Sequence, residues 1–199
     1  MYSISGSGRS KEFFNGCDAQ NYFASISSKM ETEVTQMSDA EITSCNFKEW
    51  SKYLATKYSV APISIFETNI ERTLSEAKIK KENLFRFSSY EREFVEVDGI
   101  RVTFKIPFDG DPFLFEVRPS HRILSSFATR DFVRPHDEMC GSFILDFEYT
   151  KQELHAKGTA MAEYVQKQFD NEFESYKMMI NNVNTEAVAF NNGLATSAV

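Results

Sequence analysis

A heptad repeat of apolar residues near the C-terminus constrains the fold of this 199-residue chain more than any other feature. From Phe169 onward, apolar residues recur at alternating spacings of four and three. This spacing keeps one stripe on one side of an α-helix and is typical of a coiled coil, in which the stripe packs against a partner helix. The stripe consists of Phe169, Phe173, Tyr176, Ile180, Val183, Ala187, Phe190 and Leu194.

The helix that carries this stripe is expected to begin after Thr150, because Thr150-Lys151-Gln152-Glu153 predicts a capping box. A helix of about forty residues is roughly 60 Å long, about twice the span of a small domain. It must therefore cross the body of the protein or pair with another chain. Gly158 predicts a kink or break. Residues 191–193 suggest a C-terminal stop, although Leu194 continues the stripe and suggests a longer natural chain.

The centre of the sequence predicts β-structure. Residues 94–97 and 100–106 alternate apolar and polar side chains around Asp98-Gly99, a dipeptide that tolerates the positive φ angles of a type I′ turn. We therefore expect a β-hairpin with one buried face and one wet face. The stretch 68–81 fits either a helix or a strand, with the strand favoured. Further strands are expected over 63–66, 113–117 and 143–149.

Two helices are expected before the sheet. Asp18 is a candidate N-cap for the first helix. The apolar stripe of that helix comprises Tyr22, Ile26, Met30 and Val34. Asn46 and Glu49 suggest a capping box at the start of the second helix. Its expected buried face comprises Phe47, Trp50 and Leu54.

These elements predict an α+β fold. The expected sheet is mixed or antiparallel and has about four to six strands, with the N-terminal helices packed on one face and a long C-terminal helix. The expected organisation is a disordered tail over 1–12, an α+β domain over 13–149 and a long amphipathic helix over 150–199, which the pattern at its end suggests could continue in a longer native chain. With 19 Phe residues, the core should be built by aromatic burial.

Charge and cysteine content limit the partners and the compartment. The net charge of −7 repels polyanions and disfavours general nucleic-acid binding. Three widely separated cysteines suit a reducing compartment, in which they would be small buried apolar residues. The sequence has no secretory signal pattern and no apolar run of membrane-spanning length, so a cytoplasmic protein without a membrane partner is expected.

A set of acids at expected strand ends is the first candidate for catalysis. Asp98, Asp111 and Glu116, followed by Arg118, resemble the acid pattern of a Mg²⁺-dependent nuclease of the restriction-endonuclease-like kind. Those enzymes place a Lys where Arg118 stands. Acids that favour turns explain the same pattern, so no catalytic residue is assigned and an enzyme is not expected.

A basic stretch in the middle of the chain is the candidate ligand site. Its arginines could bind phosphate while Phe127 and Phe132 stack on a base, which makes a nucleotide or nucleic acid a candidate ligand. Solvated arginines explain the pattern equally well. The arginines are Arg118, Arg122, Arg130 and Arg134. No histidine or cysteine lies at metal-ligand spacing and no phosphate loop occurs, so no metal and no cofactor is expected.

Taken together, the order of the elements resembles the N-terminal module of uncharacterised multidomain bacterial proteins. The strings that carry this resemblance are the Asp98-Gly99 pair, residues 106–111, Arg118-Pro119-Ser120 and the closing helix with Asn191 and Asn192. In those proteins the module precedes a nuclease or a Toll/interleukin-1-receptor-like domain in antiviral defence. The resemblance implies a sensing or assembly part.

The expected function is therefore a non-enzymatic sensing, interaction or oligomerisation module. The apolar stripe would be its contact surface, with a second copy or a partner helix as the other side. The alternative is a Mg²⁺-dependent nuclease or a nucleotide-binding sensor domain.

Overall fold

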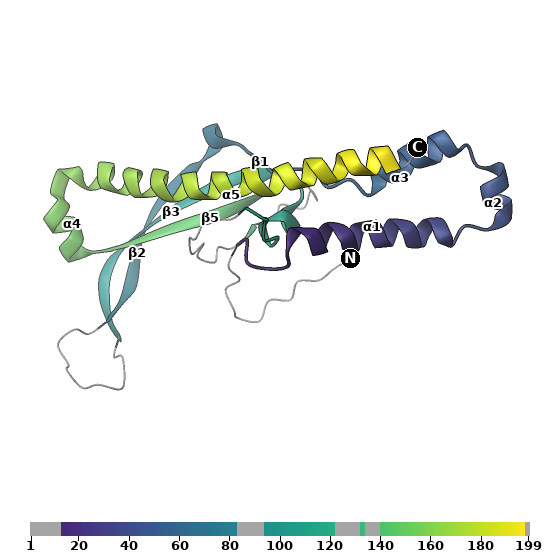
Figure 1. Ribbon diagram of the computed structural model, residues 1–199. Coiled ribbons are helices and arrows are strands. Elements are labelled where there is room, and N and C mark those ends of the chain that lie inside the picture. The colour runs from purple at the N-terminus through teal and green to yellow at the C-terminus, as the bar shows by residue number, and fades with distance from the viewer. Residues whose placement is uncertain (1–12, 83–93, 122–131, 134–139, 198–199) are drawn as a thin grey trace.

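An antiparallel sheet covered by a long C-terminal helix forms the body of the protein (Figure 1). The computed structural model describes residues 13–82, 94–121, 132–133 and 140–197. The central strand β3 pairs with β1 and β2 along one edge and with β5 along the other, and β5 also pairs with β4. The strands are β1 (Ser64–Ile65), β2 (Glu71–Glu82), β3 (Phe94–Asp109), β4 (Phe132–Val133) and β5 (Cys140–Thr150). The predicted α+β fold is confirmed.

The hairpin predicted at Asp98-Gly99 is wrong, because β3 runs straight through these residues. Gly99 instead permits a close approach of neighbouring strands. A Cβ atom at this position would overlap Cδ1 of Ile79 on β2 and the carbonyl oxygen of Tyr149 on β5. The observed hairpin is formed by β2 and β3, which pair from Glu71 to Glu82. The preference for a strand within 68–81 is confirmed.

The two faces of β3 differ as the alternation predicts. Val102, Phe104 and Ile106 are buried on one face. On the other face, Arg101 Nη2 lies 2.7 Å from Glu148 Oε1 and Thr103 donates a hydrogen bond of 2.6 Å to Asp146. These polar pairs join β3 to β5 on the more solvent-exposed face of the sheet.

The predicted capping box at Thr150 is confirmed, but the helix after it is interrupted. The Thr150 amide donates to Glu153 at 2.8 Å and the Glu153 amide donates to the Thr150 hydroxyl at 3.3 Å. A hydrogen bond from Lys81, together with the one from the Thr150 amide, lowers the pKa of Glu153 to about 2. Gly158 then takes a φ of 52°, which ends α4 (Lys151–Lys157). After the short helix η3 (Gly158–Ala160), α5 runs over Met161–Ser197 and does not stop at Gly193.

The apolar stripe of α5 packs on the sheet. The Phe169 ring stacks on Phe104 of β3 with a centroid distance of 4.0 Å, and Tyr176 stacks on Phe143 of β5 at 5.7 Å. Every stripe residue is buried except Phe190, which is partly buried. The stripe is thus covered within the chain, by the sheet along Phe169 to Tyr176 and by Phe23 of the N-terminal segment at Phe190, and this cover occupies the surface that the sequence suggested for a second copy.

Two asparagines of α5 hold the segment that enters β1. Asn184 accepts a hydrogen bond from the Ile63 amide at 2.8 Å and donates to the Ile63 carbonyl at 2.7 Å. Asn191, two helical turns later, makes the same pair of bonds with Val60, at 2.9 and 2.8 Å. These side chains satisfy the amide and carbonyl groups of Val60 and Ile63, which do not pair with a neighbouring strand.

The strand predicted over 113–117 is wrong, because Pro112–Phe115 form the 3₁₀ helix η2. Asp111 accepts from the Phe113 amide at 2.9 Å and Pro112 stands at the first helical position, a combination that favours a helix start. The residues around η2 hold the N-terminal segment, since Phe14 donates its amide to the Phe115 carbonyl at 2.7 Å.

The N-terminal helices are α1 (Ala19–Thr35), α2 (Asp39–Ser44) and α3 (Phe47–Lys57). The α1 and α3 helices contact α5, and α2 lies beyond the C-terminal end of α5 (Figure 1). Asp18 occupies the predicted N-cap position of α1, but its side chain makes no capping bond. The capping box predicted at Asn46 is absent; it occurs at Ser38 and Glu41 and caps α2.

Candidate functional site

A helical extension lies beyond the sheet at one end of the molecule (Figure 1). We define the helical arm as residues 24–58, which comprise most of α1, all of α2 and α3, and Tyr58. No residue from 24 to 53 is buried. Leu54, with 5% of its surface exposed, is the first buried side chain after this stretch. Apart from Leu54 and the partly buried Ile26, which packs against the core, the arm buries little apolar surface within the chain.

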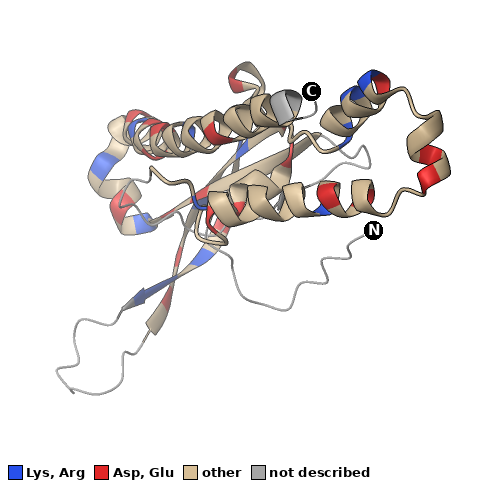
Figure 2. Ribbon diagram, turned by 45° about the vertical axis from the view of Figure 1, so that its right-hand side comes forward, with Lys and Arg blue, Asp and Glu red and all other residues tan. Residues whose placement is uncertain are grey.

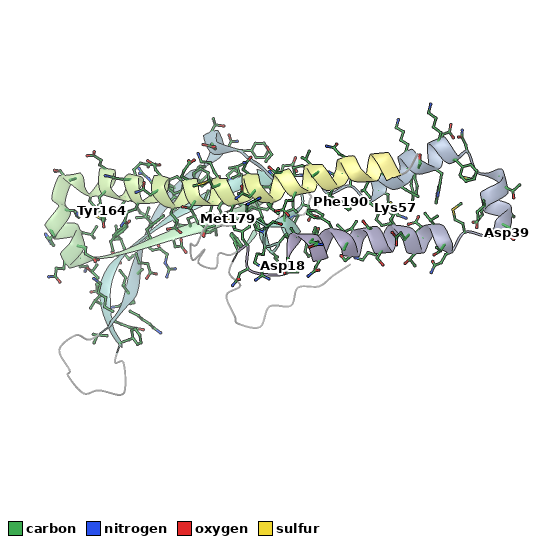
Figure 3. All side chains as sticks on the ribbon, in the orientation of Figure 1. Asp18, Asp39, Lys57, Tyr164, Met179 and Phe190 are labelled. Atoms are coloured by element: carbon green, nitrogen blue, oxygen red, sulfur yellow. The ribbon has the colours of Figure 1, made fainter. Side chains whose placement is uncertain are left out.

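The arm is attached to the body at its two ends. Phe23, just before the arm, stacks on Phe190 of α5 with a centroid distance of 4.9 Å. Leu54 is buried near the end of α3, and α3 contacts α5. Figure 3 labels Phe190 beside the attached end and Asp39 at the far end of the arm. The middle of the arm is the part furthest from these anchors.

A polar cluster joins the two long helices of the arm. Lys57 of α3 lies 2.6 Å from Glu33 of α1, and the Tyr58 hydroxyl also donates to Glu33. The hydrogen bond from Lys57 lowers the pKa of Glu33, and the hydrogen bond to Glu33 raises the pKa of both Lys57 and Tyr58. Because these groups are solvent-accessible, they orient the helices without contributing much stability.

Large apolar side chains are exposed on all three helices of the arm. The exposed fractions are 41% for Val34, 40% for Ile42, 66% for Phe47 and 49% for Tyr53. Val34 and Phe47 were expected on buried faces, so those two assignments are wrong. Trp50 is half-buried and stacks on Tyr53 at 5.2 Å, and no described residue accepts a hydrogen bond from its indole nitrogen.

Opposite charges gather on different helices of the arm, as Figure 2 shows. The charged residues of α2 are Asp39 and Glu41, which give it a formal charge of −2. The charged residues of α3 are Lys48, Glu49, Lys52 and Lys57, which give it a formal charge of +2. Within the described chain, no ion pair joins α2 to α3. The arm thus presents an acidic helix and a basic helix separately.

The candidate catalytic acids do not converge. Asp98 lies within β3 and Asp111 follows its far end at Asp109, so eleven positions of extended strand, or about 36 Å at roughly 3.3 Å per residue, lie between Asp98 and that end. Asp98 binds Lys78 and lies 3.6 Å from Lys151. Asp111 caps η2 and accepts a hydrogen bond of 3.0 Å from Tyr22, whose pKa is raised by burial. These carboxylates have structural partners.

Glu116 and Arg118 lie at the junction with the N-terminal segment. The Glu116 carbonyl accepts from the Gly16 amide at 2.9 Å. The Arg118 guanidinium lies 2.7 Å from Asp18, and its hydrogen bond to Asp18 raises the pKa of Arg118. Arg122, Arg130 and Arg134 lie outside the described residues. Arg118 is therefore the one candidate phosphate ligand that the structure locates, and it is paired with an acid.

The three cysteines are free thiols, as expected, but they are not buried. Cys17 and Cys140 are exposed and Cys45 is half-buried. In the described ranges, no group of three or more His, Cys, Asp or Glu side chains could hold a metal ion.

A groove lies between β2 and α5. Its volume is about 590 Å³, and its lining includes Phe104, Phe169 and Phe173. The polar lining is largely engaged: Lys177 lies 2.9 Å from Glu174 and 3.6 Å from Glu67. The groove has room for a ligand, and two of its acidic residues, Glu67 and Glu174, are engaged with Lys177.

Comparison with known proteins does not identify a relative of this chain. No protein-family model matches the chain, and neither a curated protein nor a solved structure matches it. Across the described helices, none combines the length and apolarity needed to span a bilayer.

Proposed function

We propose that this chain is a non-enzymatic interaction module and that the helical arm is its contact surface. The supporting observation is the absence of any buried residue from 24 to 53. Helices as short as α2 and α3 are marginal in water without tertiary packing. Exposed apolar side chains gathered in one region mark surfaces that contact another molecule.

The arm replaces the α5 stripe as the proposed contact surface. The stripe is covered within the chain, whereas Val34, Ile42, Phe47 and Tyr53 are exposed. A cytoplasmic location forms part of the proposal and is supported by the free thiols. The resemblance to modules of bacterial defence proteins adds the proposal that such an assembly part serves a larger protein of that kind.

Polar substitution in the arm tests whether its apolar residues are needed for folding. We expect Phe47→Ser and Ile42→Ser each to change the free energy of unfolding by no more than about 0.5 kcal/mol, because neither side chain is buried. The matched control is Phe23→Ser at the arm's anchor. It should cost about 3 kcal/mol or more, because Phe23 is 8% exposed and stacks on Phe190.

Urea unfolding of the three variants gives these values at protein concentrations low enough to keep the chain monomeric, because a bound partner would add to the stability of the folded chain. A loss at Phe47 or Ile42 as large as that at Phe23 would mean that the arm is packed inside the chain. The proposed function would then be wrong, since its apolar residues would be explained by folding alone.

A further inference from the structure

We propose that the partner of the helical arm is a second copy of this chain, bound about a two-fold axis so that α2 of each copy lies against α3 of the other. This inference rests on the proposed function, since it names the partner of the same surface. It adds how the two arms are arranged and which charged residues determine that arrangement.

The charges of the arm are self-complementary between copies. The acidic helix α2 has a formal charge of −2, and the basic helix α3 keeps a net charge of +1 once its Lys57 is paired with Glu33. Asp39 and Glu41 form no ion pair with any described residue, and neither do Lys48 and Lys52. Among the described residues, Asp39, Glu41, Lys48 and Lys52 therefore have no partner of opposite charge, although Glu41 accepts hydrogen bonds from Ser38 in the capping box of α2. A two-fold axis brings each acidic helix to a basic helix, and it does so twice because the interface is isologous.

The apolar residues have the distribution that this arrangement needs. Ile42 lies on α2, and Phe47 and Tyr53 lie on α3, so the same two helices that differ in charge also expose apolar surface. Aromatic residues at the centre with charges at the rim are typical of protein interfaces. The charges would set the orientation and the apolar side chains would supply the affinity.

The attachment of the arm leaves this surface accessible. The α1 and α3 helices are joined through Glu33, Lys57 and Tyr58 near the anchored end. The residues proposed to meet the partner run from Asp39 to Tyr53, and none of them is buried. A partner can cover them without displacing a buried side chain of the body.

Complementary charge reversal tests the pairing. The α2 variant carries Asp39→Lys and Glu41→Gln, in which Gln can keep the capping box with Ser38. The α3 variant carries Lys48→Glu and Lys52→Glu. In the α2 variant both helices are positive, and in the α3 variant both are negative. Each variant alone therefore places like charges at both contacts.

We expect the wild-type chain to reach twice its mass of 22.9 kDa in light scattering or sedimentation equilibrium at tens of micromolar. Each variant alone should dimerise at least about tenfold more weakly. An equimolar mixture should restore the dimer, because both contacts then pair opposite charges. The control Lys167→Glu changes an exposed charge on α5, away from the arm, and should leave the dissociation constant unchanged.

Three results would overturn the inference. A wild-type monomer at 100 micromolar would exclude the second copy as partner. Unchanged dimerisation of both variants would place the interface elsewhere. Failure of the mixture to restore the dimer would reject the pairing of α2 with α3. None of these results depends on the unfolding experiment with Phe47→Ser, so the proposed function and this inference fail separately.

Discussion

Phe143→Ala is expected to lower the free energy of unfolding by about 3–5 kcal/mol, the usual cost of removing a fully buried Phe ring. Phe143 is 0% exposed. Its ring lies 5.4 Å from Phe115 of η2, 5.7 Å from Tyr176 of α5 and 6.1 Å from Phe13 of the N-terminal segment. One truncation therefore loosens the contact of the sheet with three separate elements.

Chemical denaturation compares this variant with Phe94→Ala, which removes the same ring where it is 60% exposed. The exposed substitution should cost less than about 1 kcal/mol. Equal losses at the two positions would contradict the burial that places the core between β5 and α5.

Gly110→Ala is expected to destabilise the protein by several kcal/mol. Gly110 has a φ of 106°, which an L-residue rarely adopts. A Cβ atom there would overlap the Pro62 carbonyl oxygen and lie 2.8 Å from its carbon. Both are backbone atoms of the segment held by Asn184 through Ile63, so the segment cannot move away without breaking those bonds.

Gly193→Ala is expected to have the opposite effect and to stabilise the protein. Gly193 lies within α5, and a Cβ atom there would meet nothing within 4 Å. Alanine should stabilise the helix by up to about 1 kcal/mol. Thermal unfolding of the two variants should therefore shift in opposite directions. An unchanged unfolding temperature for Gly110→Ala would show that the turn after β3 does not approach the Pro62 carbonyl closely.

Local patterns predicted the elements that depend on neighbouring residues. The Thr150 capping box, the break at Gly158 and the alternation of β3 all follow from short-range chemistry, and the structure has each of them. The stripe on α5 was also visible, because a period of seven in apolar residues is a strong helix signal.

The element that packs on each apolar face could not be predicted from the sequence. The α5 stripe fits a partner helix as well as it fits a sheet, and only the tertiary fold decides between them. Asp98-Gly99 has the composition of a turn, yet Gly99 is required by the approach of Ile79 and Tyr149 from neighbouring strands. Pro112 after Asp111 could have indicated the 3₁₀ helix η2 in place of a strand.

The arm was missed for a similar reason. The apolar residues of α1 and α3 have helical spacing, which predicted buried faces, but the helices extend beyond the surface that could bury them. The acidic composition of α2 and the basic composition of α3 were the available signals. They became informative only when the structure showed that the two helices do not pair within one chain.

The most direct measurement is quenching of Trp50 fluorescence by acrylamide across protein concentrations. Trp50 is the only tryptophan of the chain and lies on α3 in the arm, so its emission reports this surface alone. We expect quenching to fall as the concentration rises through the dimer dissociation constant. The α2 charge-reversal variant should keep the quenching of the monomer throughout that range. Identical quenching of both proteins at every concentration would contradict the claim that a partner copy covers the arm.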